Sequence, residues 1–164
     1  MVAYHNKDTP EGQLVTVEQI VRNFWAKYGR NYYSRHDYEN VDAAKADEFM
    51  AHLVSQQKDL VGKQLGSFTV ATADEFEYVD SFDKSVSSHQ GVRIIFTDGS
   101  RIIFRLSGTG SSGATIRVYL EQYRDDPSQF DQETQVALKE LIDIALSLSK
   151  IKEFTGRDEP TVIT

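Results

Sequence analysis

The residues best suited to chemistry lie in one segment, residues 105–117, with the sequence Arg-Leu-Ser-Gly-Thr-Gly-Ser-Ser-Gly-Ala-Thr-Ile-Arg. It places three glycines and five hydroxyl side chains between Arg105 and Arg117. Glycines let backbone N–H groups approach an anion closely. Hydroxyl groups add neutral donors, and guanidinium groups bind phosphate through two parallel hydrogen bonds. We interpret this Gly/Ser segment as a phosphate-binding loop, with a flexible Gly/Ser turn as the alternative.

Apolar runs rich in β-branched residues flank the Gly/Ser segment and predict the strands that position it. Residues 92–96 and 101–106 are joined by the sequence Thr-Asp-Gly-Ser, which is a strong signal for a hairpin turn. Residues 115–123 predict a further strand after the segment. Because the chain returns antiparallel, we expect the two arginines to emerge side by side at the edge of the sheet.

The strand predicted for residues 101–106 has two different faces. Side chains alternate along a strand, so Arg101, Ile103 and Arg105 share one face. The other face is apolar and consists of Ile102, Phe104 and Leu106.

Three segments have the periodicity of amphipathic helices. Thr16 and Gln19 form a capping-box pattern that begins a helix predicted for residues 17–28. Further helices are predicted for residues 41–58 and 131–150. The side chains expected on the apolar face of each helix are Ile20, Val21, Phe24, Trp25 and Tyr28, then Ala46, Phe49, Met50, Leu53 and Val54, then Val136, Leu138, Leu141, Ile142, Ala145 and Leu148.

The remaining segments are less regular. Residues 1–15 are interpreted as an irregular lead-in, and residues 67–72 and 76–79 as short strands. Residues 30–38 are both basic and aromatic. A linker packed on its neighbours is the favoured interpretation of these residues. The alternative is contact with a phosphate or a sugar through Arg30, Arg35 and His36.

Composition restricts the class of protein. The 164 residues are enough for one domain, and 40% hydrophobic with 26% charged residues is typical of a soluble globular chain. A net charge of −7 argues against nucleic acid or an anionic membrane as the main partner. The absence of cysteine excludes a disulfide framework, a thiolate zinc site and a thiol nucleophile. Without a signal peptide or a membrane-length apolar run, we expect a cytoplasmic protein.

Other motifs give weaker signals. The Gly/Ser segment is not a nucleotide P-loop, because no Gly-Lys-Ser/Thr follows its glycines. Ser88 precedes His89, but no base or metal-binding loop accompanies the serine, so a surface loop is favoured over a nucleophile. The acidic pairs Asp80 with Asp83 and Asp125 with Asp126 lack the spacing of a metal-binding loop and are interpreted as solvated turns.

Three stretches together resemble the C-terminal domain of the α-D-phosphoglucomutases, within the α-D-phosphohexomutase superfamily. They are residues 97–117 around the Gly/Ser segment, residues 29–39 with the sequence Gly-Arg-Asn-Tyr-Tyr-Ser-Arg-His-Asp-Tyr-Glu, and the ending at 155–157 and 160–164. The resemblance therefore covers nearly the whole chain, and its loop motif is specific.

The patterning alone predicts an α+β fold in which helices pack on one face of an antiparallel sheet. The resemblance implies that this sheet is four-stranded and TATA-binding-protein-like. It also implies that residues 1–38 are the end of a preceding domain and a linker, and that residues 39–164 form a C-terminal phosphate-binding domain.

The resemblance further implies a role for the Gly/Ser segment. Four positions match the family residues that hold the non-reacting phosphate of the substrate, namely Arg105, Ser107, Thr109 and Arg117. Gly108 and Gly110 would shape the backbone between them.

The family enzymes are isomerases that interconvert glucose 1-phosphate and glucose 6-phosphate through a phosphoserine, Mg²⁺ and a glucose 1,6-bisphosphate intermediate. The phosphoserine, metal and sugar-recognition loops lie in preceding domains, so the resemblance implies no catalytic residue and no metal ligand in this chain. Its partners would be the phosphosugar and the remaining domains of the enzyme, and the chain alone would be inactive. The alternatives are a self-standing, non-catalytic module that binds a phosphosugar or phosphate, and a scaffold domain with a flexible loop.

Overall fold

The computed structural model describes residues 2–110 and 113–164. The chain divides into two compact units. Residues 1–31 and 123–132 form the first unit, and residues 32–122 and 133–164 form the second. The boundary expected at residue 38 falls inside a strand, Arg30–Val41.

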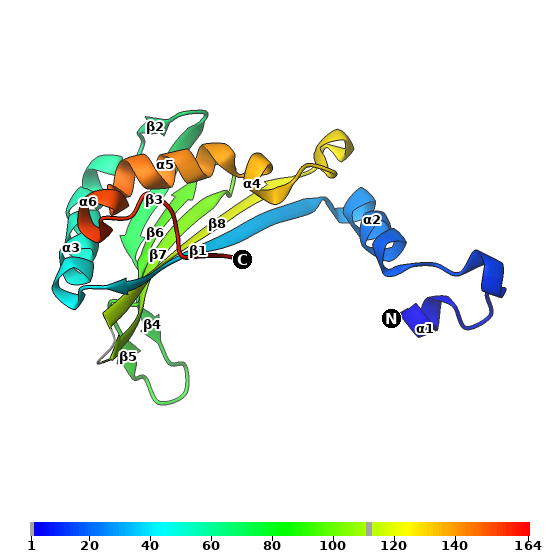
Figure 1. The fold of residues 1–164 in the computed structure, drawn as a ribbon, viewed down its shortest axis with the longest axis horizontal. Coiled ribbons are helices and arrows are strands. Elements are labelled where there is room, and N and C mark those ends of the chain that lie inside the picture. The colour runs from blue at the N-terminus through cyan, green and yellow to red at the C-terminus, as the bar shows by residue number, and fades with distance from the viewer. Residues whose placement is uncertain (1, 111–112) are drawn as a thin grey trace. The chain divides into compact units, whose positions relative to one another are not determined.

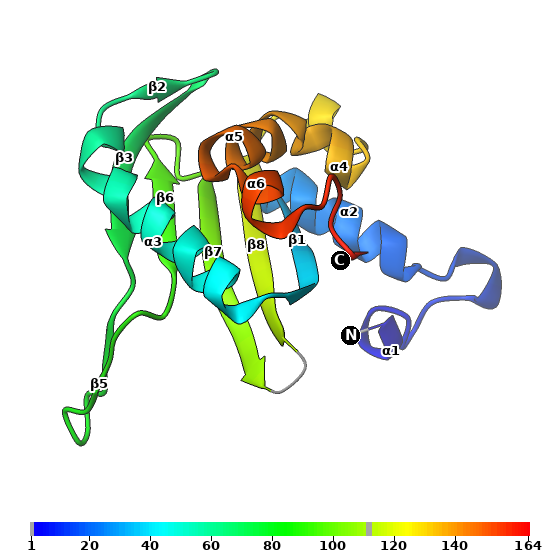
Figure 2. The ribbon, with the colours of Figure 1, turned by 60° about the vertical axis from the view of Figure 1, so that its left-hand side comes forward.

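The second unit is built on an antiparallel sheet. In the described residues this sheet has seven strands in the order β2-β3-β6-β7-β8-β1-β9 (Figures 1 and 2). The strands are β1 (Arg30–Val41), β2 (Gln64–Leu65), β3 (Phe68–Glu75), β6 (Val92–Phe96), β7 (Arg101–Gly110), β8 (Gly113–Arg124) and β9 (Val162–Ile163). A separate ladder of β4 (Tyr78–Val79) and β5 (Val86–Ser87) extends from the end of the sheet in both views.

Helices cover one face of this sheet and leave the other face open. They are α3 (Ala43–Leu60), α4 (Thr134–Ala137), α5 (Lys139–Ser149) and α6 (Ile151–Thr155) (Figure 2). The core lies between the two layers, where Phe49 of α3 meets Phe104 of β7 edge-on, with 5.8 Å between the ring centroids. Ile94, Ile102, Ile116 and Leu141 are also fully buried. The predicted antiparallel sheet with helices on one face is confirmed, but the described sheet has seven strands instead of four.

The predicted hairpin of residues 92–106 is confirmed, with Arg93 opposite Ile103 and Ile94 opposite Ile102. The helix predicted for residues 41–58 is α3, which begins after Asp42, whose carboxylate accepts the amide of Lys45 at 3.1 Å. Its Val54, expected to face inward, is 37% exposed, because the buried face of α3 runs through Ala46, Phe49, Leu53 and Leu60.

The prediction that residues 30–38 form a linker is wrong, because they belong to strand β1. The strand is hard to recognise because its buried face carries the polar residues Ser34 and His36. Gln135 satisfies both, donating to the Ser34 hydroxyl at 2.9 Å and lying 2.9 Å from His36 Nε2. The Ser34 hydroxyl also donates to the carbonyl of Thr164 at 3.0 Å. Tertiary partners thus make a polar strand face compatible with burial.

The single helix predicted for residues 131–150 is also wrong, because the chain forms α4, α5 and α6 in succession. The backbone departs from the helical conformation at Leu138, and Lys150, with φ of 51°, ends α5. Val136 is 66% exposed, whereas Leu138 is fully buried. Residues two positions apart lie on opposite sides of a helix, so the prediction that both belong to one apolar face was also wrong.

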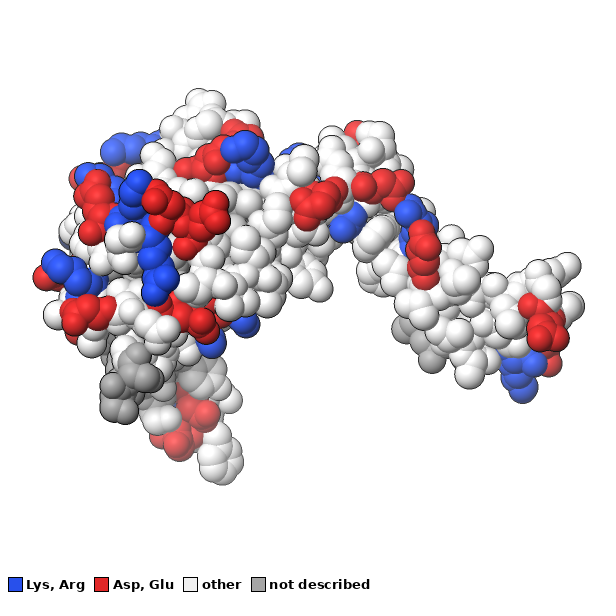
Figure 3. Space-filling model, viewed as in Figure 1, with Lys and Arg blue, Asp and Glu red and all other residues white. Residues whose placement is uncertain are grey.

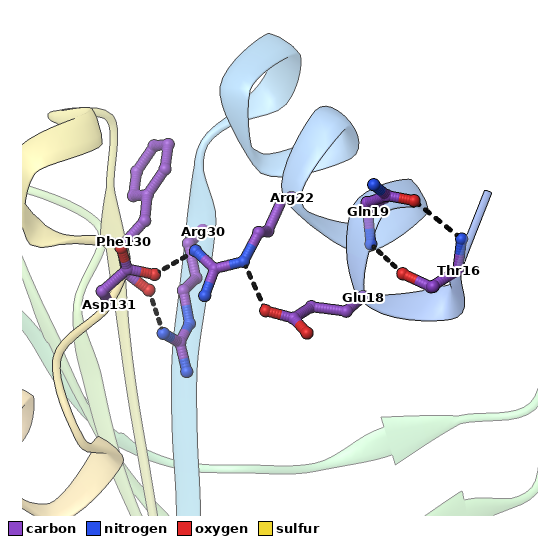
Figure 4. Close-up of polar contacts among 7 residues, drawn as sticks. All are labelled: Thr16, Glu18, Gln19, Arg22, Arg30, Phe130 and Asp131. Carbon is purple, nitrogen blue, oxygen red and sulfur yellow. Dashed lines mark hydrogen bonds and ion pairs between the residues drawn. The ribbon is translucent and has the colours of Figure 1, made fainter. Parts of the chain in front are cut away.

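The first unit contains α1 (Val2–His5), a short 3₁₀ turn (Glu11–Gln13), α2 (Val17–Tyr28) and a second 3₁₀ turn (Pro127–Gln129). The prediction that residues 1–15 are irregular is therefore wrong for Val2–His5, which form a short helix. The α2 capping box is confirmed: Gln19 N donates to Thr16 Oγ1 at 3.2 Å, and Thr16 N donates to the Gln19 side chain at 2.9 Å (Figure 4).

Two arginines tie the segments of the first unit together. Arg22 forms ion pairs with Glu18 at 2.8 Å and with Asp131, and Arg30 donates to the carbonyl of Phe130 (Figure 4). No residue of α2 is buried, and Phe24 and Tyr28 are 58% and 53% exposed.

Candidate phosphate-binding site

The hairpin of β7 and β8 places Arg105 directly opposite Arg117. Residues opposite each other in an antiparallel pair have Cβ atoms only about 5 Å apart. The expectation that these two residues, hereafter the arginine pair, lie side by side is therefore confirmed. Their expected position at the edge of the sheet is wrong, because β7 and β8 lie between β6 and β1. Their strand neighbours Phe104, Ile116 and Val118 are buried toward the helices. Because side chains alternate, both arginines belong to the open face of the sheet.

The Gly/Ser segment extends this hairpin with an irregular register. Ser107 pairs with Thr115 and Gly110 with Gly113, and the register shifts between Ser107 and Gly110. Gly108, in this shift, has φ of +67°, a conformation that glycine adopts without strain. The expected contributions of the Thr109 side chain and of Ser111 and Ser112 lie outside the described residues.

Gly113 anchors the returning end of the segment, a role that the sequence did not indicate. Its φ is +94°, and a Cβ there would lie 3.0 Å from the carbonyl oxygen of Val41. The backbone at Gly113 therefore packs on the corner between β1 and α3. This contact fixes the start of β8 and so the position of Arg117.

Arg117 is held from the side of β1 by Asp37. Its Nε lies 3.6 Å from Asp37 Oδ2, and the Nε of Arg35 lies 2.8 Å from Asp37 Oδ1. The Asp37 side chain is only 6% exposed, whereas both arginine side chains are 34% exposed. The sequence reasoning missed Asp37 and gave Arg35 only as the less favoured alternative to a linker. Their alternation on one strand face is the signal that could have identified them.

Arg105 has a different environment. Among the described residues no carboxylate lies within ion-pair distance of its guanidinium, and its side chain is exposed. Its aliphatic stem packs on Gly91, where a Cβ would lie 2.7 Å from both Arg105 Cγ and the carbonyl oxygen of Phe104. Gly91 has φ of +149°, so conformation and space both require glycine.

The other arginines of the open face are paired. Arg93 donates two hydrogen bonds to Asp74, at 2.8 and 2.6 Å, and Arg101 pairs with Glu121. The hydrogen bonds from Arg93 lower the pKa of the Asp74 carboxyl. Within the described part of the chain, Arg105 is thus the cation of this face that has no carboxylate partner.

Charges elsewhere on the second unit are mixed. In the view of Figure 3, acidic and basic side chains are interspersed over its surface. Charges of mixed sign produce no broad positive field on the side of the second unit that this view shows.

The weaker candidates from the sequence do not assemble a reactive site. The ring of His89 contacts Glu75, with Nδ1 2.7 Å from Oε1. Asp80 accepts the amides of Phe82 and Asp83, and Asp126 accepts that of Ser128, so these acids cap turns. In residues 2–110 and 113–164, no three acidic or histidine side chains are grouped as metal ligands, and no helix is long and apolar enough to cross a membrane.

Comparison with known proteins places the chain in a family. Residues 30–161 match the sequence model of "Phosphoglucomutase-1, C-terminal domain". The chain is 58% identical to the cytoplasmic phosphoglucomutase of Mesembryanthemum crystallinum, covering 100% of this chain and 30% of that protein. It is 53% identical to phosphoglucomutase-1 of Dictyostelium discoideum, with the same coverage.

A solved structure shows the same fold. The open form of parafusin, a phosphoglucomutase from Paramecium, is 51% identical and superposes with a TM-score of 0.86 over 99% of this chain and 27% of that one. The chain spans about 30% of the length of the curated relatives named above. It belongs to the phosphoglucomutase family and contains the C-terminal domain of that family.

Proposed function

We propose that the second unit holds the non-reacting phosphate of a phosphosugar for a phosphoglucomutase that interconverts glucose 1-phosphate and glucose 6-phosphate. The observation that carries this proposal is the direct opposition of Arg105 and Arg117 on the open face of the sheet. The two positive charges of Arg105 and Arg117 suit a phosphate dianion. Near them, the Asp37 carboxylate contacts both Arg117 and Arg35. Charge-assisted hydrogen bonds to phosphate are about twice as strong as neutral ones.

Each member of the proposed site has a separate task. The arginine pair neutralises the phosphate charge, and Ser107 and Thr109 supply hydroxyl donors. Gly108 and Gly110 allow backbone N–H groups to approach the phosphate oxygens. Holding this phosphate fixes the sugar while its other end reacts, which is how binding energy supports phosphoryl transfer.

The chemical step would use groups from outside this chain. Among the described residues no three acidic or histidine side chains are grouped as Mg²⁺ ligands, and Asp80, Asp83 and Asp126 each accept a backbone amide of a turn, so we derive no step through the metal. In the proposed enzyme, the phosphate-binding domain includes strand β1 with Arg35 and Asp37, instead of beginning at residue 39, and the glucose 1,6-bisphosphate intermediate reacts with groups outside this chain. We propose a cytoplasmic location, as the names of several relatives state for those proteins.

An NMR titration of the 164-residue chain with glucose 6-phosphate tests the proposal. We expect amide shifts at Ser107, Gly108 and Gly113 and an affinity of roughly 3–5 kcal/mol, near millimolar, because the other contacts of the full site are missing. Arg105→Ala and Arg117→Ala should each abolish detectable binding. Arg101→Ala is the matched control, because Arg101 lies on the same strand and face about 14 Å from Arg105. Shifts that persist in both arginine variants would refute the proposal.

A further inference from the structure

Asp37 of β1 lies next to Arg117 of the proposed phosphate site, and its carboxylate offers no hydrogen-bond donor to a phosphate. It is a carboxylate, so it repels a phosphate at close range. Yet its side chain is 6% exposed and contacts the two arginines, Arg35 and Arg117, that flank it. A buried anion beside an anion-binding site requires an explanation.

The geometry points to Asp37 as a positioning residue that aims Arg117, and with it Arg35, at the bound phosphate. This inference rests on the proposed function of the arginine pair. The inference is based on two contacts of one carboxylate. Asp37 Oδ1 lies 2.8 Å from Arg35 Nε, and Asp37 Oδ2 lies 3.6 Å from Arg117 Nε.

Both contacts are made by Nε, the atom nearest the aliphatic stem of each arginine. The terminal nitrogens, which form the fork that binds phosphate, are thus left available for a ligand. In Arg117 the Nε is buried and has no hydrogen-bond partner, so the 3.6 Å contact with Asp37 is its polar contact in the described chain. A small movement of Arg117 on phosphate binding would close this distance into a hydrogen bond.

The substitution Asp37→Asn distinguishes a positioning role of Asp37 from a purely electrostatic one, because the two roles predict opposite changes in phosphate affinity. If Asp37 acts only through its charge, removing the charge strengthens phosphate binding. If it positions Arg117, phosphate binding weakens roughly five- to tenfold, as for loss of a charge-assisted hydrogen bond. Asp74→Asn is the matched control, because it removes the same charge from the same face, at the partner of Arg93. We expect its phosphate affinity to be unchanged within about twofold, or slightly higher.

The experiment titrates inorganic phosphate into the 164-residue chain and its variants by NMR. Weaker binding by Asp37→Asn, with Asp74→Asn unchanged or tighter, supports the inference. Equal or tighter binding by Asp37→Asn overturns it, while loss of binding in Arg105→Ala would still support the proposed function. If the unsubstituted chain does not bind phosphate, the proposed function itself fails.

A second measurement needs no variant and decides the matter if Asp37→Asn does not fold. The ¹³Cγ resonance of Asp37 should shift during the phosphate titration and saturate together with the amide of Gly108. That of Asp74 should not move. An Asp37 resonance that stays fixed while the Gly108 amide saturates overturns the positioning role.

Discussion

Gly91 offers the sharpest test of how the second unit positions Arg105. An alanine Cβ at this position would lie 2.7 Å from Arg105 Cγ and 2.7 Å from the backbone oxygen of Phe104. The backbone oxygen belongs to the central strand β7 and cannot rotate away, so the substitution must displace the arginine, the strand or both. We therefore expect Gly91→Ala to reduce both the stability and the affinity for phosphate.

The expected loss of stability has two parts. A non-glycine residue in this left-handed region costs about 1–3 kcal/mol. Forcing an extra carbon against packed atoms costs about a further 1–3 kcal/mol. The control Gly62→Ala carries only the first part, because Gly62 has φ of +82° and a Cβ added there would meet no atom within 4 Å. For a chain of this size, each kcal/mol corresponds to about 2–4 °C in Tm.

Thermal unfolding by circular dichroism and phosphate titration by NMR measure the two effects. We expect Tm to fall by about 10 °C in Gly91→Ala and by about 4 °C in Gly62→Ala. Phosphate affinity should fall several-fold in the first variant and stay constant in the second. Equal losses of Tm in the two variants, or an unchanged phosphate affinity in Gly91→Ala, would refute the reasoning about the contact with Arg105.

Two further predictions concern the rest of the chain. Backbone amides of Ile20 to Trp25 should exchange with solvent faster than those of Leu141 to Leu148, because no residue of α2 is buried whereas α5 buries Leu141, Ala145 and Ser149; equal protection by hydrogen exchange would favour the self-standing module. Because the pKa of Asp74 is lowered in the folded chain, its ion pair stabilises the fold above the unfolded pKa, about 3.9, and that contribution is lost as pH falls through the lower folded value. Tm measured against pH should therefore fall less steeply below pH of about 4 in Asp74→Asn than in the unsubstituted chain, and parallel curves would contradict the assignment.

The parts of the fold predicted correctly are those governed by local signals. The turn between β6 and β7 and the capping box of α2 depend on residues within a few positions of one another. The opposition of Arg105 and Arg117 follows from the same logic, because the Gly/Ser segment returns the chain upon itself.

The errors arise where distant residues decide the outcome. Strand β1 was not predicted because Ser34 and His36 are polar residues, which are usually exposed. They are buried here because Gln135, distant in sequence, is their hydrogen-bond partner. The role of Asp37 depends on β1 lying next to β8 in the sheet, which no local pattern reveals. The break at Leu138 likewise shows that a continuous apolar period does not guarantee a continuous helix.

The opposition of Arg105 and Arg117 has a consequence for protein engineering. Like charges directly across an antiparallel pair destabilise a sheet, and a β-branched residue at either position would suit the strand better. A screen for heat-resistant variants carried out without ligand would therefore tend to replace one of these arginines. The same screen with a phosphate ester present would favour both, because a ligand that binds only the folded chain adds to its stability. The choice of screening buffer alone would decide whether the improved variants keep the site.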